Sequence, residues 1–290
     1  MKKIIVLAKQ VPDTANITGQ AMKEDGTVNR AALPAVFNPD DLNAMEAALA
    51  IKEAIGAEVI VITMGPPAAV DILKHALYMG ADRVMLISDR KFAGADTLAT
   101  SYVLAEAVKK ISAVGGFVDL VLAGRQAIDG DTAQVGPQVA EKIGFNQITY
   151  ITGIETITED YLIVARDGEL QTERIKTPFP ALLTITNEAN TPRYPNCLNM
   201  LKYFRADTAS QFDDGQIETA RAHNQVIPMW KADDLGLDIK RCGIKGSPTR
   251  VSKIENITLT GGDLELYDTD SMAIKQLVQD LRKDYAEVNE

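Results

Sequence analysis

Residues 118–144 read VDLVLAGRQAIDGDTAQVGPQVAEKIG, and this stretch decides the predicted fold. An apolar run of strand length, VDLVLA, leads into a loop with two glycines and two carboxylates, and a helical segment follows it up to Gly144. A strand that is apolar on both faces is typical of a parallel sheet with helices on both sides. The stretch therefore predicts a strand–loop–helix unit whose loop lies at the carboxyl end of a buried strand.

Three more runs of the same kind precede it, KIIVLA (3–8), EVIVITM (58–64) and RVMLIS (83–88), and helical spacing separates them. The clearest helix is NPDDLNAMEAALAIKEAIG (38–56), in which Asn38 is the expected N-cap, Pro39 suits the first turn and Gly56 ends the helix. Strands that alternate with helices predict an α/β fold, a twisted parallel sheet of Rossmann-like type with helices on both faces.

The pattern changes after residue 147. ITYITGIETI, YLIVARDGELQTERI and PALLTIT alternate, and the Asp167-Gly168 pair indicates a hairpin, so we expect an antiparallel extension of the sheet. From Asn187 the periodicity is lost, which favours an arm over the surface. Residues 269–288 then predict an amphipathic terminal helix capped by Thr269 or Asp270. We thus expect a core over 1–186 and an arm with its helix over 187–290.

Composition limits the classes of function. The chain of 290 residues has a formal net charge of −10 and a pI near 4.9, which disfavours nucleic acid and anionic membrane surfaces as partners. Its apolar runs are too short for a signal peptide or a membrane span. The two cysteines, Cys197 and Cys242, lie far apart, so no disulfide framework is predicted and the cytoplasm is the expected location.

Common catalytic and metal signatures are missing from the sequence. It contains no G-x-G-x-x-G after the first strand, no G-x-x-x-x-G-K-[ST], no H-E-x-x-H and no paired cysteines. With two histidines, His75 and His223, nucleophilic catalysis is not expected, and we predict neither a catalytic residue nor a metal site.

Ligand binding at the strand ends is expected instead, because ligands of open parallel sheets bind beyond the carboxyl ends of the strands. Residues 7–9, 63–66 and 124–135 follow three predicted strands, and the helix start at 38–41 can join them. The glycines let backbone N–H groups approach a phosphate, and Asp129 and Asp131 suit helix capping or ribose hydroxyls. The alternative is a capped acidic surface loop without a ligand.

Several motifs resemble the β subunits of electron transfer flavoproteins over nearly the whole chain. They are VLAKQVPD, NPDDLNAMEAALAIKE, VITMGPPAA, HALYMGADR, DLVLAGRQAIDGDTAQVGP and TPFPALLTITNEANTPRY, in this order. The resemblance implies an adenine-nucleotide-binding α/β domain. It implies a cofactor site formed by Leu7, Ala8, Asn38, Pro39, Asp40, Asp41, Met64, Gly124, Arg125, Gln126, Ala127, Ile128, Asp129, Gly130, Asp131, Thr132, Ala133, Gln134 and Val135.

The resemblance also implies a heterodimer with an α subunit and two possible types. In the electron-bifurcating type, FAD in the β site takes hydride from NADH, and the electrons go to ferredoxin or flavodoxin and, through the α-subunit FAD, to an acyl-CoA dehydrogenase-like partner. In the respiratory type, the site holds a structural AMP. Small residues at 129–135, Thr14 and the long tail 230–254 favour the bifurcating type. Whether the chain is itself an enzyme stays open.

Further roles follow from the same resemblance. Arg125 could stabilise an anionic flavin or a phosphate, or form an exposed salt bridge. EANTPRY (188–194) matches the family's dehydrogenase-docking loop, with Ala189 at the anchor position, or is a simple connection. The terminal helix would pack on the α subunit, or on its own chain. A more distant alternative is a regulatory or ATP-cleaving nucleotide-binding module.

Overall fold

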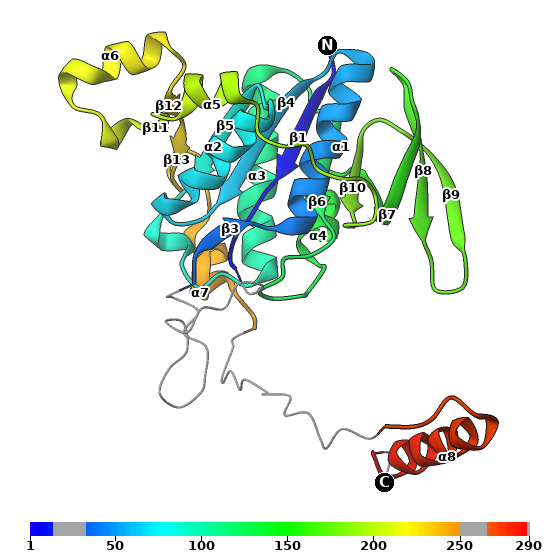
Figure 1. The fold of residues 1–290 in the computed structure, drawn as a ribbon. Coiled ribbons are helices and arrows are strands. Elements are labelled where there is room, and N and C mark those ends of the chain that lie inside the picture. The colour runs from blue at the N-terminus through cyan, green and yellow to red at the C-terminus, as the bar shows by residue number, and fades with distance from the viewer. Residues whose placement is uncertain (14–32, 250–265, 289–290) are drawn as a thin grey trace. The chain divides into compact units, whose positions relative to one another are not determined.

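The computed structural model describes residues 1–13, 33–249 and 266–288, so that Thr14 and residues 250–254 lie outside the described residues. Its central sheet has the strand order β13-β5-β4-β1-β6-β10-β7-β8-β9 (Figure 1). The strands from β13 to β7 are parallel, whereas β8 and β9 are antiparallel. The predicted α/β fold with a mostly parallel sheet is confirmed. The strands are β1 (Lys3–Leu7), β4 (Glu58–Met64), β5 (Arg83–Ile87), β6 (Leu120–Gly124), β7 (Asn146–Ile157), β8 (Tyr161–Asp167), β9 (Thr172–Pro178), β10 (Ala181–Ile185) and β13 (Met229–Trp230).

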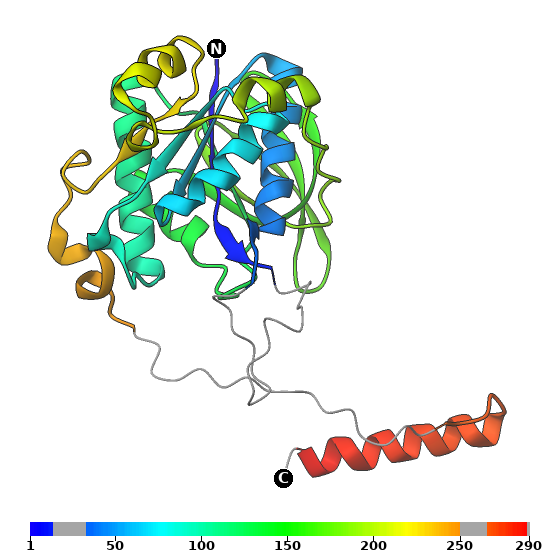
Figure 2. The ribbon, with the colours of Figure 1, turned by 60° about the vertical axis from the view of Figure 1, so that its left-hand side comes forward.

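Helices cover both faces of the sheet, as Figures 1 and 2 show. Side chains alternate along β1, so that Ile4 and Val6 join the apolar layer under α1 and α2, while Ile5 and Leu7 join the layer under α3 and α4. Burial on both faces explains why these strands are continuous apolar runs. The helices of this unit are α1 (Pro39–Ile55), α2 (Val70–Met79), α3 (Thr97–Gly115), α4 (Val135–Ile143), α5 (Cys197–Tyr203), α6 (Asp214–Ala222) and α7 (Gly243–Gly246).

Helix α1 begins and ends where the sequence predicts. Pro39 occupies the first turn, and Gly56 adopts the left-handed conformation (φ 71°) with its N–H bonded to the Lys52 carbonyl. The expected side-chain cap by Asn38 is wrong, because Asn38 makes no capping hydrogen bond. Its amide is used by the 124–135 loop instead, which only the tertiary structure could show.

The strands after residue 145 confirm the antiparallel extension in part. β7 pairs with β8 and β8 with β9 as hairpins. β10 departs from the expectation, because it lies between β6 and β7 and is parallel to both. All five residues of β10 are buried, which explains its position inside the parallel sheet rather than in the half-exposed extension.

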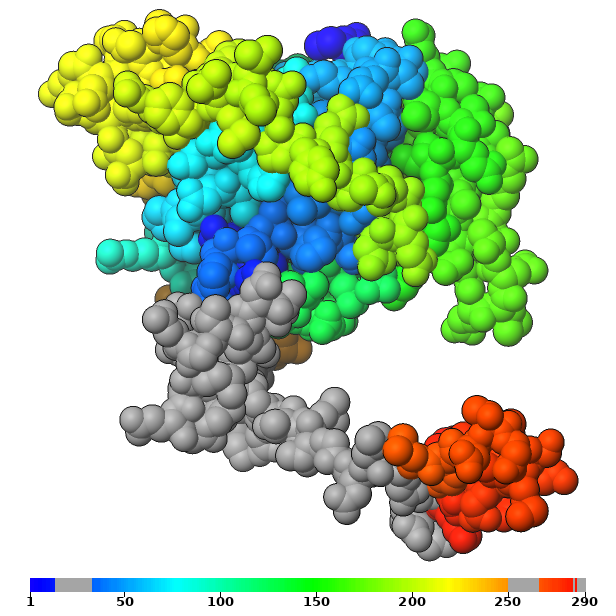
Figure 3. All heavy atoms as spheres, viewed as in Figure 1, coloured from blue at the N-terminus to red at the C-terminus, as the bar shows by residue number. Residues whose placement is uncertain are grey.

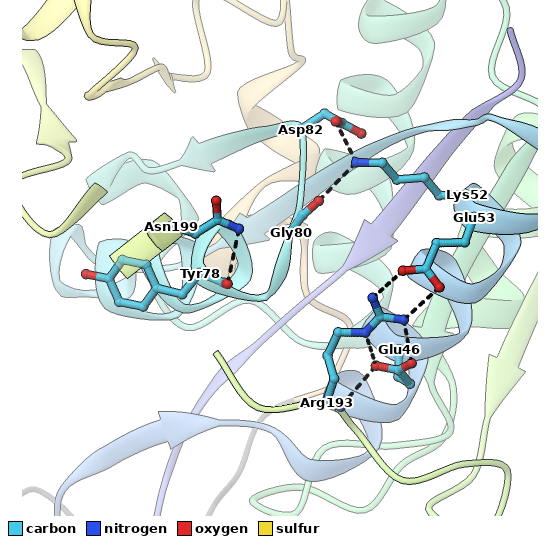
Figure 4. A network of polar contacts seen from close by, with 8 residues as sticks. All are labelled: Glu46, Lys52, Glu53, Tyr78, Gly80, Asp82, Arg193 and Asn199. Atoms are coloured by element: carbon cyan, nitrogen blue, oxygen red, sulfur yellow. Dashed lines mark hydrogen bonds and ion pairs between the residues drawn. The ribbon is translucent and has the colours of Figure 1, made fainter. Parts of the chain in front are cut away.

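Residues 187–249 are fixed to the sheet and its helices. The Arg193 guanidinium bonds the carboxylates of Glu46 and Glu53 on α1, and the Asn199 amide donates to the Tyr78 carbonyl (Figure 4). The band of residues 187–225 therefore lies over the α1–α2 face (Figure 3). β13 then extends the sheet beside β5. Two small ladders complete this unit, β2 (Gln10–Pro12) with β3 (Ala35–Phe37) and β11 (Asp207–Thr208) with β12 (Val226–Ile227).

Contacts divide the chain into Met1–Ser252 and Lys253–Glu290. The predicted functional division at residue 186 stays a prediction. In the second unit, helix α8 (Ser271–Val288) is capped by Asp270, whose Oδ1 accepts from the N–H groups of Met272 and Ala273. Among the described residues, no helix has the length and apolar character that crossing a membrane requires.

Candidate functional site

A cavity of 640 Å³ lies beyond the carboxyl ends of β1, β4 and β6, at the edge where β3 lies in Figure 1. This volume is in the range of small-molecule sites. Fourteen of the predicted cofactor-site residues line it, namely Leu7, Ala8, Asp41, Met64, Gly124, Arg125, Gln126, Ala127, Gly130, Asp131, Thr132, Ala133, Gln134 and Val135. The structure thus brings together three strand ends and the loop before α4.

Asp41 joins the parts of the site. Its carboxylate accepts from the Lys9 N–H at 2.8 Å and from the Gly124 N–H at 2.9 Å, so it ties α1 to the ends of β1 and β6. A Cβ on Gly124 would lie 2.7 Å from the backbone carbon and from the Cβ of Asp40, which explains the glycine. Burial raises the pKa of Asp41 to about 7, although its two backbone hydrogen bonds favour the ionised form.

Asn38 holds the loop from beneath rather than lining the cavity. Its side-chain amide donates to the Gln126 carbonyl at 2.8 Å and accepts from the Ile128 N–H at 3.1 Å. Asn38 is fully buried, so both bonds replace solvent contacts that the amide and the loop backbone cannot make. Asn38 therefore positions the loop, and Pro39 is an exposed residue of the first turn of α1.

The buried Asp40 and the partly exposed Arg125 form an ion pair beside the cavity. Arg125 Nε lies 3.6 Å from Asp40 Oδ2, and within the described chain neither atom has a hydrogen-bond partner. Burial raises the pKa of Asp40, and the Arg125 charge opposes this shift. The Arg125 guanidinium also lies 5.8 Å from the ring centre of Tyr150. Arg125 thus lines the cavity as a residue, while its Nε is buried on the side of Asp40.

The loop itself is wound tightly between residues 127 and 134. The N–H groups of Gly130 and Asp131 donate to the Ala127 carbonyl, and Asp131 and Ala133 have positive φ values of 48° and 52°. Such values cost non-glycine residues about 1 kcal/mol or more, and they cluster at functional sites. In the described chain, the N–H groups of residues 132–135 have no protein acceptor, so they can bind an anion before α4.

Asp129 is paired rather than open to a ligand. Lys9 Nζ contacts both of its carboxylate oxygens, at 2.6 and 2.8 Å, and this bridge links the end of β1 to the loop. Asp129 was expected to cap N–H groups or to accept from ribose hydroxyls. In this structure both oxygens of its carboxylate accept from Lys9 Nζ instead. The two cations at the cavity, Lys9 and Arg125, therefore each have an acidic neighbour.

Part of the cavity wall was missed by sequence reasoning. The segment that follows β5 and the first turns of α3 contribute a whole side, and Asp96 caps α3 by accepting from the Ala99 N–H at 3.0 Å. The signal was present, because RVMLIS is a fourth buried strand whose carboxyl end must lie at the same edge. Lys9 was expected at this edge among residues 7–9, and the missed residues are Phe92, Gly94, Ala95, Asp96, Thr97, Thr100, Leu104, Ala123, Gly136 and Thr249.

The arrangement suits binding rather than acid–base chemistry. It offers unpaired backbone donors for a phosphate, apolar walls from Leu7, Met64 and Leu104, and hydroxyls at Thr97 and Thr132. An adenosine phosphate needs these features: an apolar slot, hydroxyl partners and a helix start for its charge.

Comparisons with known proteins give a consistent picture. The family model for the electron transfer flavoprotein domain matches residues 25–222. The chain is 45% identical over 250 residues to the electron transfer flavoprotein subunit beta of Clostridium acetobutylicum, with 86% of each chain covered. It is 44% identical over 261 residues to the caffeyl-CoA reductase-Etf complex subunit CarD of Acetobacterium woodii, covering 90% of each. The acryloyl-CoA reductase electron transfer subunit gamma of Anaerotignum propionicum is 38% identical over 281 residues, covering 96% of this chain and 97% of the relative.

Proposed function

Because the chain belongs to the electron transfer flavoprotein family, as one of its β subunits, we propose that it holds FAD in the 640 Å³ cavity and accepts hydride from NADH. The observation that carries this proposal is the loop 124–135, which has unpaired N–H groups at residues 132–135 and lines the cavity beyond the ends of β1, β4 and β6. When bound, the flavin supplies the redox chemistry, and the protein supplies position and electrostatics.

The residues at the cavity fit the adenosine and phosphate part of FAD. The N–H groups of residues 132–135 would bind a phosphate, and Gly130 leaves open space, since no atom lies within 4 Å of the Cβ it lacks. Arg125 lines the cavity and would place a positive charge beside an anionic group of the ligand, while its Nε is buried against Asp40. Asp41 and Asn38 would act through the backbone, by fixing the loop on which these donors lie.

AMP is the second candidate, because it offers the same adenosine and phosphate to the same donors. FAD is favoured by the small side chains at 130, 132 and 133, which leave room beyond the first phosphate. Two relatives carry names of CoA-ester reductase systems, caffeyl-CoA and acryloyl-CoA reductase. Both observations support our proposal that this chain is of the bifurcating type, which would pass electrons to ferredoxin or flavodoxin and, through an α-subunit FAD, to an acyl-CoA dehydrogenase-like enzyme.

The docking surface for that enzyme is assigned to α5 rather than to the expected anchor, Ala189. Ala189 packs against the core under α1, and Arg193 is bound to α1 by two carboxylates. Five residues on α5 and directly beside it, next to this clamp, expose apolar side chains. They are Tyr194, Leu198, Met200, Leu201 and Phe204.

Helix α8 is the proposed contact with the α subunit. Its apolar residues Ile274, Val278, Leu281 and Tyr285 follow helical spacing, and each is about half exposed or more. An amphipathic helix with an exposed apolar stripe requires a partner, and a heterodimer supplies one. Both cysteines are free thiols, which suits the reducing cytoplasm as the location.

The test is the cofactor content of the chain purified with an α subunit of the family. Two FAD per heterodimer, with bleaching of flavin absorbance on anaerobic addition of NADH, is the expected result. One FAD with one AMP, and no response to NADH, would contradict the bifurcating assignment and favour the respiratory type. A control variant, Lys176→Gln on the distant strand β9, should leave both readouts unchanged.

A further inference from the structure

A second cavity of 360 Å³ lies beside the cofactor cavity and is lined by basic side chains. Its wall is formed by the start of α3, the end of α4 and the segment around α7, which lies at the lower edge of the sheet in Figure 1. The lining residues are Leu98, Tyr102, Lys142, Lys240, Arg241, Lys245, Gly246, Ser247 and Pro248. Four of these nine residues are cations and none is acidic.

The four cations are Lys142, Lys240, Arg241 and Lys245, and they form no ion pair within the described parts of the chain. In an acidic protein with a net charge of −10, unpaired cations at one cavity are unexpected, because carboxylates are in excess. Burial and the nearby Arg241 charge lower the pKa of Lys142, so these groups repel one another when the cavity is unliganded.

Two carboxylates near the cavity, those of Asp238 and Asp96, accept hydrogen bonds from other groups. Asp238 Oδ1 accepts from the Lys240 N–H, and Asp96 accepts from Ala99 and from both the N–H and hydroxyl of Thr249. The cavity is also stiffened from one side, because the Arg241 guanidinium lies 3.8 Å from the ring centre of Tyr102. A fixed guanidinium with three lysines suits a multiply charged phosphate better than a single carboxylate.

We infer that this cavity binds a phosphate-bearing small anion, either a free phosphate or pyrophosphate or the diphosphate of a nucleotide. The two cavities are neighbours, since Thr97 and Thr249 line the larger one and Leu98 and Pro248 the smaller. A ligand here would therefore bind next to the proposed flavin nucleotide without displacing it. The 360 Å³ volume of the second cavity lies within the range of small-ligand pockets.

The test is calorimetric titration of the full chain, purified with its α-type partner, at low salt. Pyrophosphate, inorganic phosphate, ADP and NADH serve as separate probes. Lys240→Gln/Lys245→Gln removes two exposed cations, and Lys176→Gln on β9 is a control that removes one cation far from the cavity. We expect pyrophosphate to bind the parent and the control, and the Kd to rise about tenfold or more in the double variant.

The probes also identify the source of the anion. Pyrophosphate binding without ADP or NADH binding at this site supports a free anion, whereas tighter ADP or NADH binding that the double variant loses supports a nucleotide. The inference is overturned if no probe binds the parent, or if all Kd values are equal in parent and double variant. Weaker subunit association in the double variant, with no probe binding, would also overturn it and indicate an acidic protein contact. Flavin content tests the cofactor site separately.

Discussion

Replacing Gly124 by alanine tests how the cofactor cavity is assembled. The new Cβ would lie 2.7 Å from two atoms of Asp40 and against the carboxylate of Asp41. These atoms belong to the first turn of α1, which is packed on the sheet, so the helix start must move. Overpacking of this kind costs about 1–3 kcal/mol. Displacing the charged hydrogen bond from the Gly124 N–H to Asp41 adds about 1.5–3 kcal/mol.

The expected loss is therefore about 2.5–6 kcal/mol in the free energy of unfolding, which corresponds to a fall in Tm of roughly 5–24 °C. Gly130→Ala is the matched control, because it lies in the same loop with nothing within 4 Å of the new Cβ. We expect that variant to stay within about 0.5 kcal/mol of the parent in stability. Its methyl group should instead weaken nucleotide binding, since it projects into open space beside the cavity.

Chemical denaturation of both variants, with and without added nucleotide, separates the two effects. A Gly124→Ala chain that unfolds at the parent's midpoint would refute the reasoning, because it would show that α1 and β6 are not in contact as described. Equal stability losses in both variants would refute it as well, since the loop would then be sensitive to any added methyl group.

Three further results are expected. Burial raises the pKa of Asp41 to about 7 from an unfolded value near 3.8, so the native state binds more protons than the unfolded state between about pH 4 and 7. The free energy of unfolding should therefore fall as pH rises through this window. Asp41→Asn should remove this pH dependence, which is worth roughly 2–4 kcal/mol across the window, in denaturation curves measured at several pH values. Leu201→Asp on α5 should slow electron transfer to a partner dehydrogenase. It should not change Tm, because the Leu201 side chain is 72% exposed. The same substitution at the distant hairpin tip, Leu170→Asp, should change neither the electron-transfer rate nor Tm. Asp129→Asn breaks the salt bridge to Lys9. Because both side chains are partly exposed, its loss should cost about 1 kcal/mol or less in the free energy of unfolding. A large drop in Tm would contradict this and show that the bridge holds the loop in place.

Local patterns determined much of this protein. The apolar runs of β1, β4, β5 and β6 are buried on both faces, and such strands can form only where helices cover both sides of a sheet. Pro39 and Gly56 set the ends of α1 through backbone conformation alone, which needs no tertiary partner. The rule that ligands bind at strand ends then located most of the cavity wall, because the carboxyl ends of parallel strands share one edge.

The tertiary structure decided what depends on contacts between distant residues. Asn38 has the sequence context of a helix cap, yet its amide bonds a loop 88 and 90 residues away. β10 enters between β6 and β7, and α3 closes the cavity, because burial rather than neighbouring sequence selects their positions. The cationic cavity joins Lys142 to residues 240–248 in the same way. Periodicity and capping report the environment of a residue, but only the packed chain shows which distant group provides that environment.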